Sequence, residues 1–391
     1  MPKPDVDRRL LFVISYHHAC NDGALMALVA ILPILLDQMD LSYSEIGLLG
    51  LGLMITVVVQ LVVGRVADRM LSRYLLEIGA ALMAVSFLII PLVQDFLGLF
   101  LAVIFMRVGA SFYHPVGISW ISRRYEGPYL DTALGVQSGI GNLGVIVALA
   151  SSGFIGDHFG WQVPCLIWSG LNIIAVCGGL LLSDGTTKRD EGPTRTSHQT
   201  SVKDTLARIG VLAAPIATGG ALYQVTTYYG PLNLTTMHGW TVGSADLIFA
   251  FWIGMGTITS YYFGALSARF GRMRILKTAY LVSSFAMFAL FLISEWYLIV
   301  PVLLLFGSLL FLTYPALFAL LTEVTGEQER GTAFGIVFGY QLGGGAAVVY
   351  ACGLVADIAD DPSFAFVITG ALSLMSLLGI MYWGRASGSG D

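Results

Sequence analysis

Apolar residues form long runs along the chain, and short polar stretches separate these runs. A helix needs about 20 mostly apolar residues to cross a bilayer. Twelve runs approach or exceed this length, so the pattern predicts twelve transmembrane helices. Their approximate bounds are residues 10–36, 43–66, 74–94, 97–122, 131–156, 161–183, 209–236, 243–267, 274–294, 296–322, 331–356 and 363–384.

The longest polar stretch, residues 184–208, divides the predicted helices into two groups of six. It is rich in Ser, Thr, Gly and charged residues, which is typical of a linker. We therefore expect an all-α membrane protein with an N-terminal six-helix bundle over residues 1–183 and a C-terminal six-helix bundle over residues 209–391.

The composition excludes several other classes of protein. Of the 391 residues, 56% are hydrophobic and 12% are charged, whereas a soluble domain carries about 25% charged residues. A soluble globular protein and a disordered chain are therefore excluded. The four cysteines lie in apolar runs without CxxC spacing, so neither a disulfide framework nor a zinc site is expected. We also expect no cofactor and no nucleic-acid partner.

The positions of lysine and arginine predict how the chain is oriented in the membrane, because basic residues are enriched in cytoplasmic loops. Nineteen of the 20 basic residues lie in the termini or in even-numbered loops, and the odd-numbered loops carry acids instead. Both termini and the linker are therefore predicted to be cytoplasmic, in a multi-pass protein of a bacterial or archaeal inner membrane. The twentieth basic residue is Arg107, which falls inside a predicted helix.

The two predicted halves repeat each other when the sequence is shifted by 200 residues. The aligned pairs include Gly64 and Gly264, Arg69 and Arg269, Pro115 and Pro315, Gly153 and Gly353, and Asp157 and Asp357. Two parallel six-helix repeats are the layout of the major facilitator superfamily, whose halves rock about a site near the midplane of the membrane.

Two loops resemble the signature loop of that superfamily, GxLaDRxGRR. The loop after the second predicted helix reads GRVADRMLSR, and the loop after the eighth reads GALSARFGRMR. The resemblance implies a conformational latch, in which Asp68 accepts hydrogen bonds from a neighbouring helix end and Arg69 pairs across the loop. The residues of this predicted latch are Gly64, Asp68, Arg69, Arg73, Arg269, Gly271 and Arg272.

Within the superfamily, three segments resemble the fosmidomycin-resistance-type efflux proteins. They are His18-x-x-Asn21-Asp22, Phe112-Tyr113-His114-Pro115 and Gly139-x-Gly-Asn142-x-Gly144. The resemblance covers the N-terminal half best, and it implies export of a small antibiotic in exchange for protons. The inserted Tyr113 and the His17-His18 doublet depart from the pattern of that family.

Ionisable residues are rare in the predicted helices, and each costs about 2.5–3.5 kcal/mol at the centre of a bilayer. We interpret Asp22 as the only acid deep in a span, and Arg107 as the only deep base. His18 and Asp22 are i,i+4 and share a helix face, and His114 lies two turns from Arg107. We therefore expect these four residues to form a cluster that faces a cavity.

In this cluster Asp22, His18 and His114 are the predicted proton-coupling residues. Arg107 is always charged, so it tunes Asp22 or binds an anionic group. A static Asp22–Arg107 pair that only joins two helices is the alternative. Pro115 is expected to kink its helix beside the cluster.

Polar and aromatic side chains in both halves are the predicted substrate-binding residues. They are Arg107, His17, Asn21, Tyr113, Asn142, Tyr223, Gln224, Tyr228, Tyr314 and Gln341. The glycine-rich segments 139–144 and 343–345 predict close crossing of helices between the two halves.

These features favour a secondary transporter that works by alternating access in the lipid bilayer, as a monomer, and not an enzyme. The favoured function is proton-coupled export, by antiport, of a small polar or amphipathic compound such as an antibiotic. The alternatives are proton-coupled uptake of a small organic anion anchored by Arg107, a non-transporting membrane receptor, and transition-metal transport. His18, Asp22, His114 and Cys20 are the candidate metal ligands, but the fixed charge of Arg107 opposes a metal cation.

Overall fold

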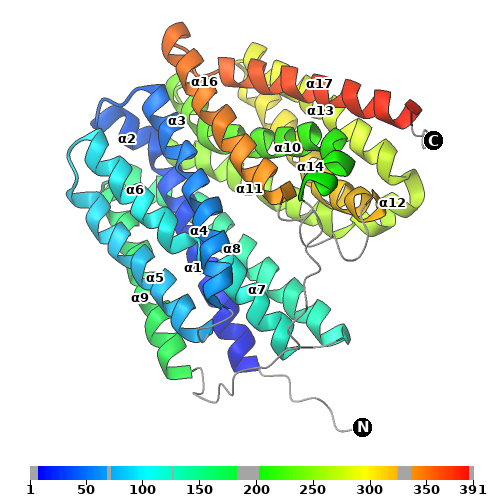
Figure 1. The fold of residues 1–391 in the computed structure, drawn as a ribbon. Coiled ribbons are helices and arrows are strands. Elements are labelled where there is room, and N and C mark those ends of the chain that lie inside the picture. Colours follow the sequence, from blue (N-terminus) through cyan, green and yellow to red (C-terminus); the bar gives the residue numbers. More distant parts are fainter. Residues whose placement is uncertain (1–7, 68–71, 126, 183–201, 325–335, 387–391) are drawn as a thin grey trace. The chain divides into compact units, whose positions relative to one another are not determined.

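We describe a computed structural model of the chain over residues 8–67, 72–125, 127–182, 202–324 and 336–386. Within these ranges the regular secondary structure is helical and contains no strand, as the sequence predicts. The elements are α1 (Arg8–Ala30), α2 (Leu32–Gln38), α3 (Tyr43–Leu51), α4 (Leu53–Ala67), α5 (Ser72–Ile89), η1 (Ile90–Leu92), α6 (Phe96–Ala110), α7 (Tyr113–Arg124), α8 (Gly127–Phe159), α9 (Gln162–Leu182), α10 (Val202–Thr236), α11 (Val242–Tyr261), α12 (Phe263–Phe270), α13 (Arg272–Leu292), α14 (Trp296–Val324), η2 (Tyr340–Gly344), α16 (Gly345–Ala359) and α17 (Phe364–Ala386) (Figure 1).

Ten helical stretches of the described residues are long and apolar enough to cross a membrane. The pair α1 and α2, bent by 40°, makes an eleventh candidate. The remaining predicted span, residues 209–236, lies on α10, a helix of 35 residues that is less apolar over its described part. Over its described residues, each of the twelve predicted spans therefore coincides with a helix or with consecutive helices, and residues 331–335 of the eleventh span lie outside the described ranges.

The described residues group into two compact units. The first takes its residues from Met1–Leu41, Gly52–Arg195 and Thr241–Leu247, and the second from Ser42–Leu51, Thr196–Trp240 and Ile248–Asp391. α3 thus belongs to the second unit, and the start of α11 to the first. The predicted linker over residues 184–208 lies mostly outside the described residues, and the predicted division of the chain stays a prediction.

In the first unit α1 packs against α8 and α9, and α5 packs against α6 and α9 (Figure 1). Glycines allow α1 and α8 to approach closely. A Cβ atom at Gly144 would lie 2.3 Å from the carbonyl oxygen of Ala19, and one at Gly141 would lie 2.5 Å from the His18 ring. In the second unit Gly345 similarly meets Gln224 of α10.

The prediction that these glycines serve crossings between the two halves is therefore wrong. Both segments contact a helix of their own unit, because neighbouring helices inside a bundle are the ones that need close backbone approach.

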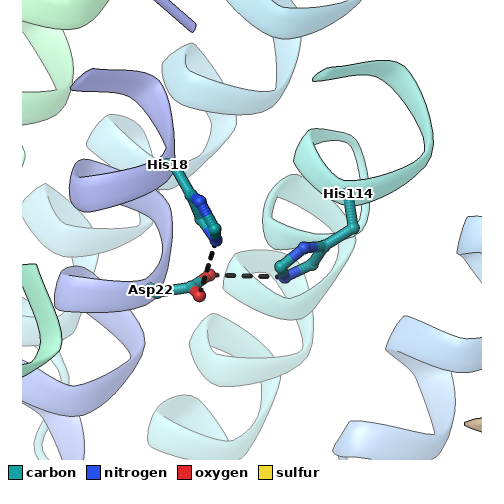
Figure 2. Close-up of side chains that lie close together, drawn as sticks. All are labelled: His18, Asp22 and His114. Atoms are coloured by element: carbon teal, nitrogen blue, oxygen red, sulfur yellow. Dashed lines mark hydrogen bonds and ion pairs between the residues drawn. The ribbon is translucent and has the colours of Figure 1, made fainter. Parts of the chain in front are cut away.

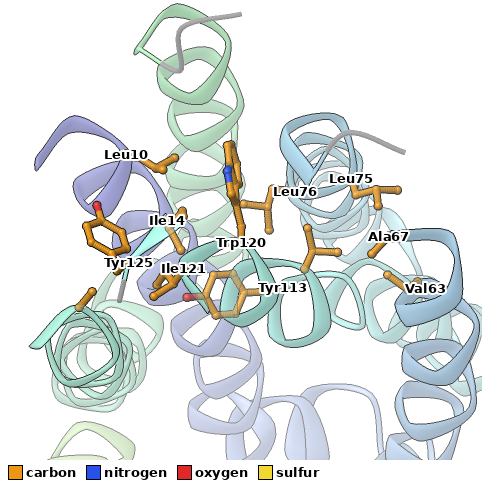
Figure 3. Packing of buried hydrophobic residues seen from close by; sticks show 12 residues of the cluster. Leu10, Ile14, Val63, Ala67, Leu75, Leu76, Tyr113, Trp120, Ile121 and Tyr125 are labelled. Carbon is orange, nitrogen blue, oxygen red and sulfur yellow. The ribbon is translucent and has the colours of Figure 1, made fainter. Parts of the chain in front are cut away.

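A cluster of buried apolar side chains holds α7 against α1 (Figure 3). Tyr113, Trp120 and Ile121 of α7 share this cluster with Leu10 and Ile14 of α1, and α4 and α5 add further members. All five of these side chains are at most 7% exposed. Burial of this apolar surface fixes the position of α7 beside α1, and this places His114 near Asp22.

The predicted span 97–122 is broken into α6 and α7 at Ser111 and Phe112. The break lies four residues before Pro115, whose ring clashes with the carbonyl group of residue i−4 in a continuous helix. The hydroxyl of Ser111 donates to the carbonyl oxygen of Arg107 at 2.6 Å. Arg107 therefore lies in the last turn of α6 and His114 in the first turn of α7, within one candidate span, Phe96–Arg124.

The internal repeat reappears at the starts of two helices. Asp157 accepts a hydrogen bond from the backbone N–H of Gly243 at the start of α11, at 3.0 Å. Its counterpart Asp357 accepts from the N–H groups of Tyr43 and Ser44 at the start of α3, at 2.7 and 3.0 Å. In both copies an acid satisfies backbone donors that a helix start leaves free.

Candidate functional site

Asp22 of α1 lies between two imidazoles (Figure 2). Its Oδ2 atom is 3.0 Å from Nε2 of His18, and its Oδ1 atom is 3.4 Å from Nε2 of His114 on α7. The side-chain amide of Asn21 donates to Oδ1 at 2.8 Å. The structure therefore brings the three predicted proton-coupling residues together.

The orientation of His18 determines where its proton sits. Its Nδ1 atom is 2.9 Å from the carbonyl oxygen of Gln137, and a carbonyl oxygen only accepts, so Nδ1 is the donor. Tyr113 stacks on the ring at 4.3 Å, and its hydroxyl donates to Gln137 Oε1 at 2.7 Å. These contacts hold Nε2 of His18 toward Asp22.

This orientation makes the His18–Asp22 contact a place for one proton. In neutral His18 with its hydrogen on Nδ1, the Nε2 atom is an acceptor, and an ionised Asp22 oxygen is also an acceptor. Two acceptors 3.0 Å apart require a proton between them. The proton resides on His18 or on Asp22, and losing it leaves the contact without a hydrogen bond.

Exposure increases from His18 to His114. The side chain of His18 is 8% exposed, that of Asp22 is 23% exposed, and that of His114 is 40% exposed. His114 is thus the member of the cluster with the best access to solvent, while His18 is held inside.

Arg107 lies at the end of α6 and is 5% exposed. Thr56 of α4 donates to its backbone carbonyl at 3.4 Å. The two imidazoles of His18 and His114 lie within ion-pair distance of Asp22. Its predicted part in tuning Asp22 or holding substrate stays a prediction.

A second histidine–acid pair lies next to the cluster. His17 is buried, and its Nε2 atom is 3.6 Å from Oε1 of Glu77 on α5. Glu77 is therefore a buried acid, 7% exposed, that the sequence analysis did not single out. Glu77 follows Arg73 by one helical turn, so in sequence it reads as an interfacial charge, and only the packing of α5 against α1 and α9 buries it.

A small cavity borders His17 of this pair and Asn21, which donates to Asp22. Its volume is about 10 Å³, and its lining includes His17, Asn21 and Tyr113. This is roughly the space of one water molecule. Three predicted site residues thus line a small cavity beside the Asp22 cluster.

In the second unit, four of the predicted substrate-binding residues lie near one another on α10, α14 and η2. Tyr223 stacks on Trp252 at 5.6 Å, and Phe311 contacts both Tyr223 and Tyr314, with ring centroids 5.9 and 6.1 Å apart. The amide of Gln224 donates to the carbonyl oxygens of Gln341 and Leu342, at 3.4 and 3.2 Å. Residues Tyr340–Gly344 form a π-helix, a conformation that is frequent at functional sites.

Two further predicted substrate-binding residues lie elsewhere. Asn142 is half-buried on α8, and Tyr228 is buried on α10 one turn beyond Gln224. Gln224 also has its Oε1 atom buried without a hydrogen-bond partner among the described residues. An unsatisfied buried acceptor of this kind is available to a donor group on a substrate.

The predicted latch is described only in part, because Asp68 and Arg69 lie outside the described residues. Gly271 joins α12 to α13 with a φ of 80°, a conformation that favours glycine. Arg73 donates to the carbonyl oxygen of Leu180 at 2.6 Å. The other members are Gly64 on α4, Arg269, which lies over the Phe270 ring at 5.1 Å, and Arg272 at the start of α13.

The same cluster has a donor set that suits a divalent metal ion. One ligand atom from each of His18, Asp22 and His114 lies within 4.8 Å of the others. Cys20, the fourth residue considered as a ligand, instead turns to α9 and donates to the carbonyl oxygen of Leu171 at 3.5 Å. Imidazole and carboxylate groups are common ligands of transition metals.

Comparison with known proteins identifies the family. A sequence profile of the Major Facilitator Superfamily matches residues 18–349. The chain belongs to the major facilitator superfamily. It is therefore a multi-pass membrane transporter and not an enzyme, as the sequence predicts.

Relatives of known sequence and structure agree with this assignment. The uncharacterised MFS-type transporter YfnC of Bacillus subtilis (strain 168) is 24% identical over 389 residues, which is 95% of this chain and 91% of that protein. The fosmidomycin resistance protein of Escherichia coli (strain K12) is 22% identical over 358 residues, 89% of this chain and 86% of that protein.

Two solved structures share the fold of this superfamily transporter. The nucleoside transporter NupG has a TM-score of 0.79 and 16% identity, and the match covers 97% of this chain and 98% of that one. A bacterial homologue of the human lysosomal transporter Spinster has a TM-score of 0.80 and 14% identity, covering 98% of both chains.

Proposed function

We propose that this superfamily member exports a small polar or amphipathic compound in exchange for protons, and that Asp22 with His18 and His114 binds the exchanged proton. The observation that carries the proposal is the 3.0 Å contact between Asp22 and a His18 ring that donates from its other nitrogen. This contact needs a proton, and the proton is lost or gained when the neighbours of Asp22 change.

Coupling then follows because the substrate and an imidazole compete for contact with Asp22. If substrate binding replaces an imidazole partner of Asp22, the cluster holds its proton less tightly and releases it. When the substrate leaves and the imidazole returns to Asp22, the cluster binds a proton again. His114 is the exchange point because it is the most exposed member, and the Tyr113 and Gln137 contacts keep His18 in place.

The choice of export and of an antibiotic-like substrate is supported by the segments around Asp22, His114 and Asn142. These resemble the fosmidomycin-resistance-type proteins, and the E. coli relative carries that name. The proposal places the protein in the inner membrane as a monomer, with both termini in the cytoplasm. The aromatic and amide groups of the second unit then contact the substrate.

The proposal is tested in proteoliposomes that contain a pH-sensitive dye and an acidic lumen. Fosmidomycin added outside is expected to cause proton efflux that is absent in protein-free vesicles. The same vesicles without fosmidomycin report the proton leak. A substrate-dependent flux that is insensitive to the pH gradient would contradict proton coupling.

The metal-ligand geometry favours a second candidate function, transport of a divalent transition-metal ion. In that case the cargo would bind His18, Asp22 and His114 directly. Zn²⁺ or Mn²⁺ added to the same vesicles would then drive proton efflux while fosmidomycin would not. Uptake of a small organic anion with protons, in which Arg107 binds the anion, predicts instead that an added carboxylate carries protons inward.

A further inference from the structure

The joint between α8 and the start of α11 contains two acids. Asp246 of α11 lies against Gly153 of α8, where a Cβ atom would overlap its carboxylate. Gly243, one turn earlier, lies against Phe154. Asp157, one turn after Gly153, binds the backbone N–H of Gly243. The two helices therefore pack closely through two glycines, with an acid from each helix at the contact.

The two acids differ in whether their carboxylate oxygens have hydrogen-bond partners. Asp157 is exposed and hydrogen-bonded. Asp246 is 0% exposed, and neither of its carboxylate oxygens has a hydrogen-bond partner among the residues that the structure describes.

The backbone donors at the start of α11 are not available to Asp246. Gly243 donates to Asp157, Ser244 donates to the Thr241 hydroxyl at 3.2 Å, and Ala245 donates to the Thr241 carbonyl at 3.0 Å. Thr241 and Asp157 therefore use the N–H groups that would otherwise stabilise a carboxylate at a helix start.

Charged neighbours do not favour an ionised Asp246 either. The charged group that acts on it from α8 is the Asp157 carboxylate, which repels a second negative charge. His158, the other titratable group on this end of α8, is exposed and binds the carbonyl oxygen of Phe154 through Nδ1 at 2.9 Å.

The internal repeat provides a comparison within the chain. A shift of 200 residues aligns Gly153 with Gly353, Asp157 with Asp357 and Asp246 with Ile46. In the matching joint between α16 and α3, Ile46 is 0% exposed. An apolar residue therefore suits this position, and the acid is not needed for packing.

We propose that Asp246 is a second proton-binding group, which is protonated while the start of α11 packs against α8 and releases its proton when the two helices separate. An ionised carboxylate that is fully buried without donors or a cation is strongly disfavoured. The neutral acid avoids this cost. Exposure to water removes the penalty and allows the proton to leave.

Asp246 lies close to the boundary between the two units along the chain. Residues Thr241–Leu247 belong to the first unit, and α11 continues in the second from Ile248. The joint therefore lies next to the point where α11 passes from one unit to the other. The proposal rests on the proposed proton-coupled transport, because it gives the cycle a second titrating group besides Asp22.

The test follows the joint by the distance between two spin labels as the pH is varied, in purified protein without substrate. The labels are placed by Phe159→Cys on α8 and Leu247→Cys on α11, both exposed positions, after Cys177→Ser removes the exposed native thiol. We expect a short distance at low pH and a growing population of longer distances as the pH rises.

Asp246→Asn, a neutral residue of the same shape, is expected to keep the short distance at every pH. Asp246→Ile, which places the residue of the other repeat at this position, is expected to behave in the same way and serves if the Asn variant does not fold. Asp131→Asn, an exposed acid on the same α8 helix, is the matched control and is expected to follow the unchanged protein.

A wild-type distance that does not depend on pH overturns the proposal, as does an unchanged transition in both Asp246 variants. The measurement is repeated in an Asp22→Asn background, where the Asp246-dependent transition is expected to persist. A failure of the proposed transport function would appear in the vesicle assay and leave this transition intact, so the two failures are distinguishable.

Discussion

Asp22→Asn is expected to abolish proton efflux from fosmidomycin-treated proteoliposomes and to leave the protein folded. Asparagine has the shape of aspartate, but its side-chain amide does not take up or release a proton in the pH range of the assay. Its amide can still donate to Nε2 of His18, so the contact between the two side chains keeps a hydrogen bond without a mobile proton. The dye signal should fall to the level of protein-free vesicles.

Asp37→Asn is the matched control for this variant. It makes the same change of charge at an exposed acid of α2, next to α1 in the chain. We expect wild-type proton efflux from this control and an unchanged elution profile from both variants. Substrate-driven efflux at the wild-type rate in Asp22→Asn would remove Asp22 from the coupling path.

Gly144→Val is expected to give the largest loss of stability among the variants considered. A Cβ atom here would lie 2.3 Å from the carbonyl oxygen of Ala19 and 2.7 Å from its Cα. Backbone atoms cannot rotate away, so α1 and α8 must separate. Overpacking typically costs about 1–3 kcal/mol, and we expect the upper end or more. The thermal unfolding temperature of the purified protein measures this loss.

Gly139→Val provides the matched control on the same helix. The chemical change is identical, and a Cβ atom at Gly139 would have nothing within 4 Å. Its unfolding temperature is expected to stay close to that of the unchanged protein. If the two valine variants unfold at the same temperature, the close contact between α1 and α8 is not what makes Gly144 important.

Much of the fold is predictable from the sequence because the membrane requires long apolar helices. The runs of apolar residues locate all the predicted spans, and the repeat of Asp157 at Asp357 anticipates two equivalent helix caps. Sequence does not reveal which helices meet through the glycines of residues 139–144 and 343–345. That depends on packing geometry, and the crossings proved to lie within each unit.

The cluster of His18, Asp22 and His114 is partly predictable for a similar reason. The i,i+4 spacing of His18 and Asp22 fixes their shared face, whereas the approach of His114 depends on the break between α6 and α7. Two buried acids, Glu77 and Asp246, escaped the sequence analysis because both lie close to the predicted ends of their helices. Their burial results from contacts with α1 and α8, which no local pattern encodes.

Proton release on substrate binding tests the central claim most directly. Fosmidomycin is added to purified protein in a weakly buffered solution with a pH indicator, and its binding is followed in parallel by thermal shift. The account predicts about one proton released per transporter for the unchanged protein and none for Asp22→Asn. Binding without proton release, or equal release from both proteins, would contradict the claim that Asp22 exchanges the proton.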